Sequence, residues 1–199
     1  MKRKLLPLLL MLATGVASAQ IAPEAAPAAP EVVAAVDFAD TAFVLICSAL
    51  VLLMTPALAF FYGGLSRSKS VLNTMMMSFT AIGVITIVWV VAGYSIAFGD
   101  EPMGAYFGSF QNVMLAGIDK DSTATTFNAA HLIPKYVFVM FQATFAIIAT
   151  ALISGALVDR MKFGAYIVFI ALWSVLVYAP VAHWVWDASG WLFADGALD

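Results

Sequence analysis

Two phenylalanines, Phe141 and Phe145, lie four residues apart in the apolar segment YVFVMFQATFAIIATALISG. In an α-helix this spacing places both rings on one face. The small residues between them, Ala143 and Thr144, would let another backbone approach that face. Such a pair is either ordinary packing against lipid or protein, or part of a functional surface. Spacing alone does not decide between these two interpretations.

The sequence offers no catalytic arrangement. It lacks GxSxG, HExxH and P-loop motifs, and it has no cysteine and histidine cluster with the spacing of metal ligands. We interpret His131 as a surface residue and His183 as a hydrogen-bonding residue at the end of the last apolar segment. The single cysteine, Cys47, is interpreted as a small packing residue. We therefore expect no enzymatic activity, no cofactor and no bound metal.

Polar side chains inside the apolar segments are hydroxyls and amides rather than charges. This pattern argues against a proton relay or an ion pathway built from intramembrane carboxylates. Gln142, next to Phe141, points along another face and is interpreted as an interhelical hydrogen-bonding residue. The polar residues of these segments are Ser48, Thr55, Asn73, Ser78, Thr80, Thr86, Gln142, Thr144, Thr150, Ser154 and Ser174.

The elements that carry these residues follow from composition. Of the 199 residues, 63% are hydrophobic and 11% are charged, whereas soluble domains carry about 25% charged residues. The charges leave four uncharged stretches, each longer than the ~20 residues that a helix needs to cross a bilayer. Period-two alternation is absent, which argues against a β-barrel. We expect an all-α membrane protein in contact with the lipid bilayer. Its four transmembrane helices are predicted at about 41–62, 71–98, 136–158 and 163–182.

The N-terminal segment MKRKLLPLLLMLATGVASAQ has a basic start, a short apolar core and the small-residue sequence ASA. This pattern is typical of a secretory signal peptide, here residues 1–19, cleaved before Gln20. A retained short anchor is the alternative. Residues 20–36 are rich in alanine and proline and are interpreted as a flexible periplasmic spacer.

Basic residues predict the orientation of the helices. If the N-terminus lies outside, Arg67, Lys69, Arg160 and Lys162 all fall in inner loops. The positive-inside rule and the signal peptide then agree on a multi-pass protein of the cell inner membrane, with a periplasmic N-terminus. The tryptophans after the fourth segment, Trp184, Trp186 and Trp191, are also explained by an aromatic belt at the membrane interface. The formal net charge of −3 indicates no nucleic-acid partner.

Several stretches resemble one family. FVLICSALVLLMTPALAFFYGGLSRSKSVLNT, GYSIAFGD, FVMFQATFAIIATALISGALVDRMKF and WSVLVYAPVAHWVW are similar, in order and spacing, to the ammonium transporter (Amt/Mep/Rh) family. The likeness covers residues 37–199. It implies the N-terminal part of an eleven-helix fold with inverted repeats, in which homotrimers carry one pore per subunit.

The resemblance assigns roles to four residues. It implies that Phe141 and Trp186 line an outer vestibule that recruits ammonium through their π faces. Phe145 would be the inner ring of a phenylalanine gate that strips water from ions, so that neutral ammonia crosses the apolar zone. Asp199 resembles an acidic residue near the vestibule floor, where it orders the backbone and supports recruitment.

Two departures from the family pattern set limits. The twin pore histidines and the second inverted half are absent from these 199 residues. We therefore expect the chain to be the N-terminal part of a transporter, and we expect this part alone not to conduct. His183 matches the turn before Trp186 and is not a pore histidine.

Alternative functions stay open at this point. Membership of the Rh branch of the same family is a weaker alternative. A sensor would read ammonium binding through an attached signalling domain, and a four-helix structural or regulatory subunit would not transport at all. The resemblance also implies a cytoplasmic regulator of the PII type. Its candidate contacts are the inner loops with Arg67, Lys69, Arg160 and Lys162, although the positive-inside rule explains these charges equally well.

Overall fold

The computed structural model describes residues 35–125 and 131–197. Within these residues, four helical stretches are long and apolar enough to cross a membrane: Phe38–Leu65, Val71–Phe98, Lys135–Leu157 and Phe163–Ala194. This confirms the prediction of an all-α membrane protein with four spans. The predicted signal peptide, residues 1–19, lies outside the described residues.

Only the first span is one uninterrupted α-helix. The second and fourth spans each contain a π-helical turn, in which hydrogen bonds close over one more residue than in an α-helix. The helices are α2 (Phe38–Leu65), α3 (Val71–Val88), π turn η1 (Trp89–Gly93), α4 (Tyr94–Phe98), 3-10 turn η2 (Val113–Leu115), α5 (Lys135–Leu152), α6 (Ser154–Leu157), α7 (Phe163–Trp173), π turn η3 (Ser174–Tyr178), α8 (Ala179–Trp186) and α9 (Trp191–Ala194).

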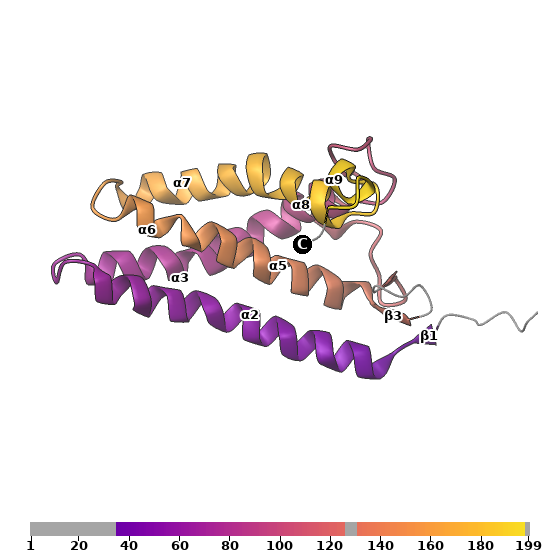
Figure 1. Cartoon of the computed structure of the whole chain (residues 1–199), viewed down its shortest axis with the longest axis horizontal. Coiled ribbons are helices and arrows are strands. Elements are labelled where there is room, and N and C mark those ends of the chain that lie inside the picture. The colour runs from indigo at the N-terminus through magenta and orange to yellow at the C-terminus, as the bar shows by residue number, and fades with distance from the viewer. Residues whose placement is uncertain (1–34, 126–130, 198–199) are drawn as a thin grey trace, which may run out of the picture. The chain divides into compact units, whose positions relative to one another are not determined.

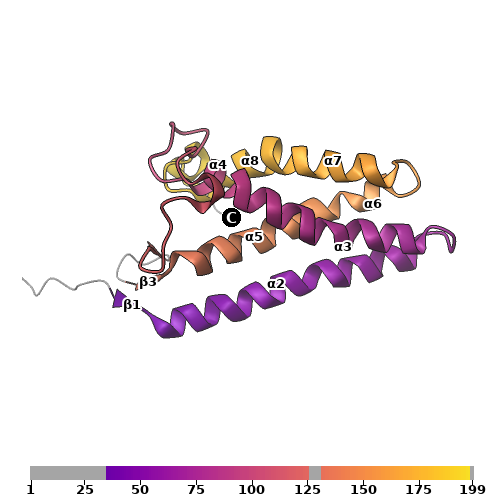
Figure 2. The ribbon, with the colours of Figure 1, turned by 180° about the vertical axis from the view of Figure 1, so that it is seen from behind.

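The spans pack with α3 and α5 in the middle. Helix α2 packs against both of them, and α7 packs against α3; both views of the ribbon show α2 and α7 on opposite sides of this pair (Figures 1 and 2). In the most apolar stretch of each span, the buried share of residues is 17% in the first span, 28% in the second, 44% in the third and 39% in the fourth. The core is therefore shared by the second, third and fourth spans, and α2 presents most of its apolar side chains outward.

A small sheet joins segments that the sequence analysis placed in a spacer and a loop. Strand β1 (Ala35–Val36) pairs in parallel with β3 (His131–Pro134), which also pairs antiparallel with β2 (Thr123–Thr125). The order β1-β3-β2 brings the start of α2 beside the start of α5. Strands of two to four residues are too short to show hydrophobic alternation in the sequence. Only their pairing with a distant segment defines them.

The start of α2 is fixed by its cap. The Asp37 carboxylate accepts hydrogen bonds from the backbone N–H groups of Ala39 at 2.8 Å and Asp40 at 3.0 Å, which satisfies donors that the first helical turn leaves unpaired. The hydrogen bond from Asp40, followed by that from the His131 side chain, holds the pKa of Asp37 below its ordinary value. The carboxylate is therefore ionised at neutral pH.

Close contact between α2 and α6 depends on Gly155. A Cβ at this position would lie 2.5 Å from Cζ of Tyr62, whose hydroxyl donates to the Leu152 carbonyl at 3.1 Å. Nearby, the Ser70 hydroxyl donates to the Asp159 carboxylate, which joins the α2–α3 loop to the α6–α7 loop. The two loops therefore lie side by side.

We expect Gly155→Ala to lower the stability of the chain by about 1–3 kcal/mol, because Tyr62 must move away from the added methyl group. Gly83→Ala is the matched control, since nothing lies within 4 Å of a Cβ added in the middle of α3. The apparent thermal midpoints of both variants in detergent test this expectation. Equal midpoints for Gly155→Ala and Gly83→Ala would contradict the close contact.

Candidate functional site

Phe141 and Phe145 meet on one face of α5, as their spacing predicts. Their ring centroids are 5.0 Å apart and their planes meet at 83°, which is an edge-to-face contact. Such contacts contribute about 0.5–1.5 kcal/mol beyond burial. Both rings are half-buried, so each keeps part of its surface accessible.

Trp186, the last residue of α8, completes the group. Its ring lies 5.9 Å from that of Phe145, with an interplanar angle of 64°. We call Phe141, Phe145 and Trp186 the aromatic cluster. Three of the four residues singled out from the sequence are thus brought together by two helices. The fourth, Asp199, lies outside the described residues.

A buried aromatic array, which sequence reasoning missed, continues from α5 into the core. Trp89 of η1 contacts Tyr94, Phe98 and Tyr178 through tilted or edge-on rings, and Phe98 contacts Phe138, one turn before Phe141, at 5.2 Å. The Trp89 indole N–H donates to the Val139 carbonyl at 3.2 Å. The four-residue spacing of Tyr94 and Phe98 was the available signal.

The position of Trp186 depends on His183, one turn earlier on α8. The imidazole is fully buried, with Nδ1 at 2.9 Å from the carbonyl oxygen of Ala97 and Nε2 at 3.3 Å from that of Gly104. A carbonyl oxygen only accepts and a neutral imidazole carries one N–H, so His183 donates to one of these two carbonyls and lies close to the other. His183 is therefore a hydrogen-bonding residue, as predicted, and it joins α8 to the end of α4 and to the loop around Gly104.

The other two tryptophans hold the same loop. The Trp184 indole N–H donates to the Tyr106 carbonyl at 2.7 Å, and its ring centroid lies 6.2 Å from that of Trp191. The backbone N–H of Trp191 donates to the Ala105 carbonyl at 3.1 Å. The three tryptophans are thus distinct: Trp186 belongs to the aromatic cluster, and Trp184 and Trp191 anchor residues 104–106 over α8.

The start of α5 is tied to the preceding loop by charge and hydrogen bonding. The Lys135 ammonium contacts the Asp100 carboxylate at 2.7 Å, and the Tyr136 hydroxyl donates to the Ile118 carbonyl at 2.7 Å. The Lys135 side chain is 14% exposed and that of Asp100 is 53% exposed, so water screens this pair from the Asp100 side. These contacts fix the end of α5 from which Phe141 projects.

Two polar side chains, those of Gln142 and Thr144, lie beside the cluster residues of α5. The Thr144 hydroxyl donates to the Phe141 carbonyl of its own helix at 2.6 Å. Among the residues that the structure describes, Gln142 makes no hydrogen bond, so its predicted interhelical bond is not observed. The neighbours of Phe141 on α5 are therefore uncharged, whereas the carboxylate of Asp187 directly follows Trp186.

The four long apolar helices make the chain a multi-pass membrane protein, with the aromatic cluster formed by α5 and α8. The sequence profile of the Ammonium Transporter Family matches residues 42–199. The ammonium transporter of Aquifex aeolicus is 52% identical over 167 residues, covering 83% of this chain and 38% of that protein. That of Bacillus subtilis is 48% identical over 160 residues, covering 80% and 38%.

Solved structures agree with this assignment. Mep2 from Candida albicans superimposes with a TM-score of 0.74 at 32% identity, covering 82% of this chain and 35% of that one. A sensor Amt protein matches with a TM-score of 0.66 at 22% identity, which shows a shared fold. The chain belongs to the ammonium transporter family, which is not enzymatic, and it spans a little over a third of the length of its curated relatives.

We expect His183→Ala to lower the stability of the chain by about 1–3 kcal/mol or more, because the carbonyl that accepts from His183, that of Ala97 or of Gly104, loses its buried donor. His183→Asn is the matched comparison, since it keeps one donor and should lose less. Thermal midpoints in detergent measure both effects. If the alanine variant is as stable as the wild-type chain, His183 does not hold the loop on α8.

Proposed function

We propose that this chain supplies the cation-recruiting surface and one side of the apolar gate of an ammonium transporter. The observation that carries the proposal is the continuous contact from Phe141 through Phe145 to Trp186. In a chain of this family, aromatic rings at the outer end of the bundle are suited to bind a small cation without a charged partner.

Recruitment would use the accessible faces of Phe141 and Trp186. Each cation–π contact contributes about 0.5–2 kcal/mol, more when water is excluded. This energy is enough to concentrate ammonium at the mouth and small enough to release it again. Asp199 would support the vestibule from its floor.

Phe145 would form the barrier between the vestibule that recruits ammonium and the apolar zone that ammonia crosses. It touches both other members of the cluster, so an ion leaving the vestibule must pass its ring. Stripping water from an ion in an apolar constriction costs several kcal/mol or more. Ammonium can release a proton and continue as neutral ammonia, whereas K⁺ and Na⁺ have no neutral form.

We also propose the wider setting in which this surface works. The signal peptide would place the N-terminus in the periplasm, and the chain would act in homotrimers in the cell inner membrane. The loops with Arg67 and Arg160 are held side by side by the bond between Ser70 and Asp159. Such a joined basic surface at the inner end would suit a cytoplasmic regulator of the PII type.

A chimera tests the proposed function. In the Aquifex aeolicus ammonium transporter, the segment that is 52% identical to this chain is replaced by the matching part of this chain. We expect the chimera to restore ammonium uptake to cells that lack their own transporters. A chimera that inserts in the membrane at the level of the parent, yet takes up no ammonium, would contradict the proposal.

In this chimera, Trp186→Leu should raise the half-saturation concentration for ammonium about two- to thirty-fold, because one π face is lost from recruitment. The saturated flux should change less. Trp191→Leu is the matched control, since the ring of Trp191 packs against Trp184. An unchanged half-saturation concentration for Trp186→Leu would rule out the cation–π role.

Phe145→Ala in the same chimera should lower selectivity for ammonium over K⁺, because a smaller side chain no longer strips water from the ion. Competition of K⁺ with labelled methylammonium uptake and K⁺ conductance are the readouts, with trimer content measured in parallel. Wild-type selectivity at unchanged trimer content would mean that Phe145 is a packing residue.

A further inference from the structure

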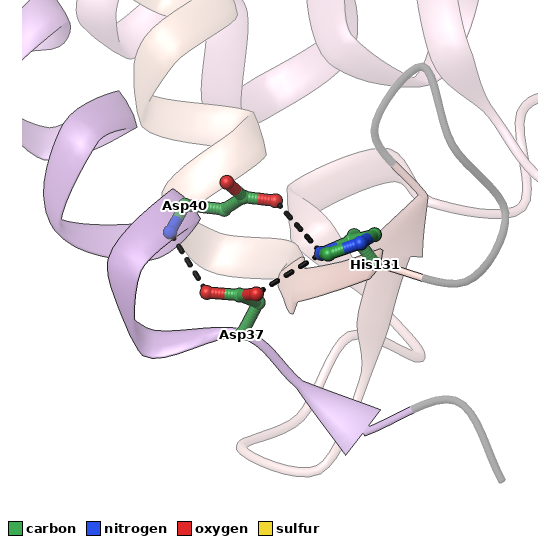
Figure 3. A group of neighbouring side chains, drawn as sticks. All are labelled: Asp37, Asp40 and His131. Atoms are coloured by element: carbon green, nitrogen blue, oxygen red, sulfur yellow. Dashed lines mark hydrogen bonds and ion pairs between the residues drawn. The ribbon is translucent and has the colours of Figure 1, made fainter. Parts of the chain in front are cut away.

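A second cluster lies at the start of the first span, away from the aromatic cluster. The imidazole Nδ1 of His131 is 3.0 Å from Oδ2 of Asp37 and 3.4 Å from Oδ2 of Asp40. Figure 3 shows both carboxylates facing the same side of the imidazole ring. One ligand atom from each residue lies within 4.8 Å of the others, although His131 is 94 residues from Asp37 in sequence.

The backbone holds these three side chains in place. The pairing of β1 with β3 puts Ala35 opposite His131, and the Asp37 N–H donates to the Leu132 carbonyl at 2.8 Å. The other oxygen of Asp37, Oδ1, is occupied by the N–H groups of Ala39 and Asp40. Capping therefore orients the Asp37 carboxylate so that Oδ2 points at the imidazole, in the way that outer partners orient metal ligands.

The spacing is compatible with a metal ion. The 3.0 Å contact with Asp37 is an ordinary hydrogen bond, whereas the 3.4 Å contact with Asp40 is long for one. Around a tetrahedral ion with bonds of about 2.0–2.1 Å, by contrast, neighbouring ligand atoms lie about 3.3 Å apart. The two observed separations, 3.0 and 3.4 Å, lie on either side of this value.

The chemistry of the three groups also fits. We propose that Asp37, Asp40 and His131 form a binding site for a divalent transition-metal ion of the zinc type. Imidazole nitrogen and carboxylate oxygen are both zinc ligands, and two carboxylates balance the charge of the ion. The side chains are 30–45% exposed, which leaves space for water at the remaining coordination position.

The ion would act as a clamp on the fold. It would join the first turn of α2 to β3, which leads directly into α5 and the aromatic cluster. Because the complete site exists only when β1 and β3 are paired, binding would stabilise the folded chain by mass action. We expected no metal from the sequence, since these ligands come from distant segments. Only the pairing of β1 with β3 brings them together.

Zinc binding to the full chain tests the proposal. The protein is prepared without a polyhistidine tag, freed of metal and titrated with Zn²⁺ in detergent by calorimetry, with Mg²⁺ as the comparison ion. We expect one Zn²⁺ per chain and a raised thermal midpoint. Co²⁺ at the same site should show the visible absorption bands of a four-coordinate ion and should be displaced by Zn²⁺.

Variants separate the site from general acidic attraction. His131→Gln and Asp40→Asn should each weaken Zn²⁺ binding at least about tenfold, since loss even of an outer partner commonly costs that much. Asp121→Asn is the matched control, because it removes one exposed carboxylate that precedes β2 and does not belong to the cluster. Far-ultraviolet circular dichroism checks that each variant keeps its helices.

Three outcomes would overturn the proposal. These are no Zn²⁺ binding tighter than that of Mg²⁺, equal binding by wild type and His131→Gln, and an equal loss in Asp121→Asn. If His131→Gln loses its helices, Asp40→Asn alone decides the matter. Asp37 is left unchanged because it also caps α2.

Discussion

Hydrocarbon offers no hydrogen bonds, and this single constraint organises the chain. Some polar side chains within the spans turn back to their own helices: the hydroxyls of Ser48 and Thr86 donate to the carbonyls of Val44 and Ile82 at 2.7 and 2.6 Å. Others join two spans, as do Ser78 and Ser154. The described residues 41–65, 71–98, 136–157 and 163–186 contain no Asp, Glu, Lys or Arg, as expected for segments in hydrocarbon. In the proposed function, aromatic faces take the place of a charged binding group.

The aromatic cluster therefore depends on contacts at the ends of the helices, where water and backbone carbonyls are available. His183 and Trp184 fasten α8 to Ala97 and Tyr106, and Lys135 fastens α5 to Asp100. These contacts support the approach of α8 to α5, and with it the contact between Trp186 and Phe145. Polar interactions at the helix ends thus support the geometry of the aromatic cluster.

The sequence was most informative where a property is local. Gaps between charges predicted the four spans, and a four-residue spacing predicted that Phe141 and Phe145 share a face. The contact of Phe145 with Trp186 could not come from spacing, because it joins two helices; the family resemblance had grouped Trp186 with Phe141 instead. The small sheet and the convergence of His131 on Asp37 depend on pairing between distant segments, which no local pattern records. The signal peptide and the role of Asp199 stay predictions, since both fall outside the described residues.

The two π turns, η1 and η3, bear on how such a chain can change over evolutionary time. A π turn holds one more residue than the α-helical turn it replaces, while the helix on either side keeps its facing. Losing one residue from Trp89–Gly93 or Ser174–Tyr178 would restore an α-helical turn without rotating the flanking faces. Elsewhere in a span, a one-residue deletion would turn everything beyond it by about 100°. Single-residue gaps between the spans of this chain and those of its relatives should therefore fall at these two turns.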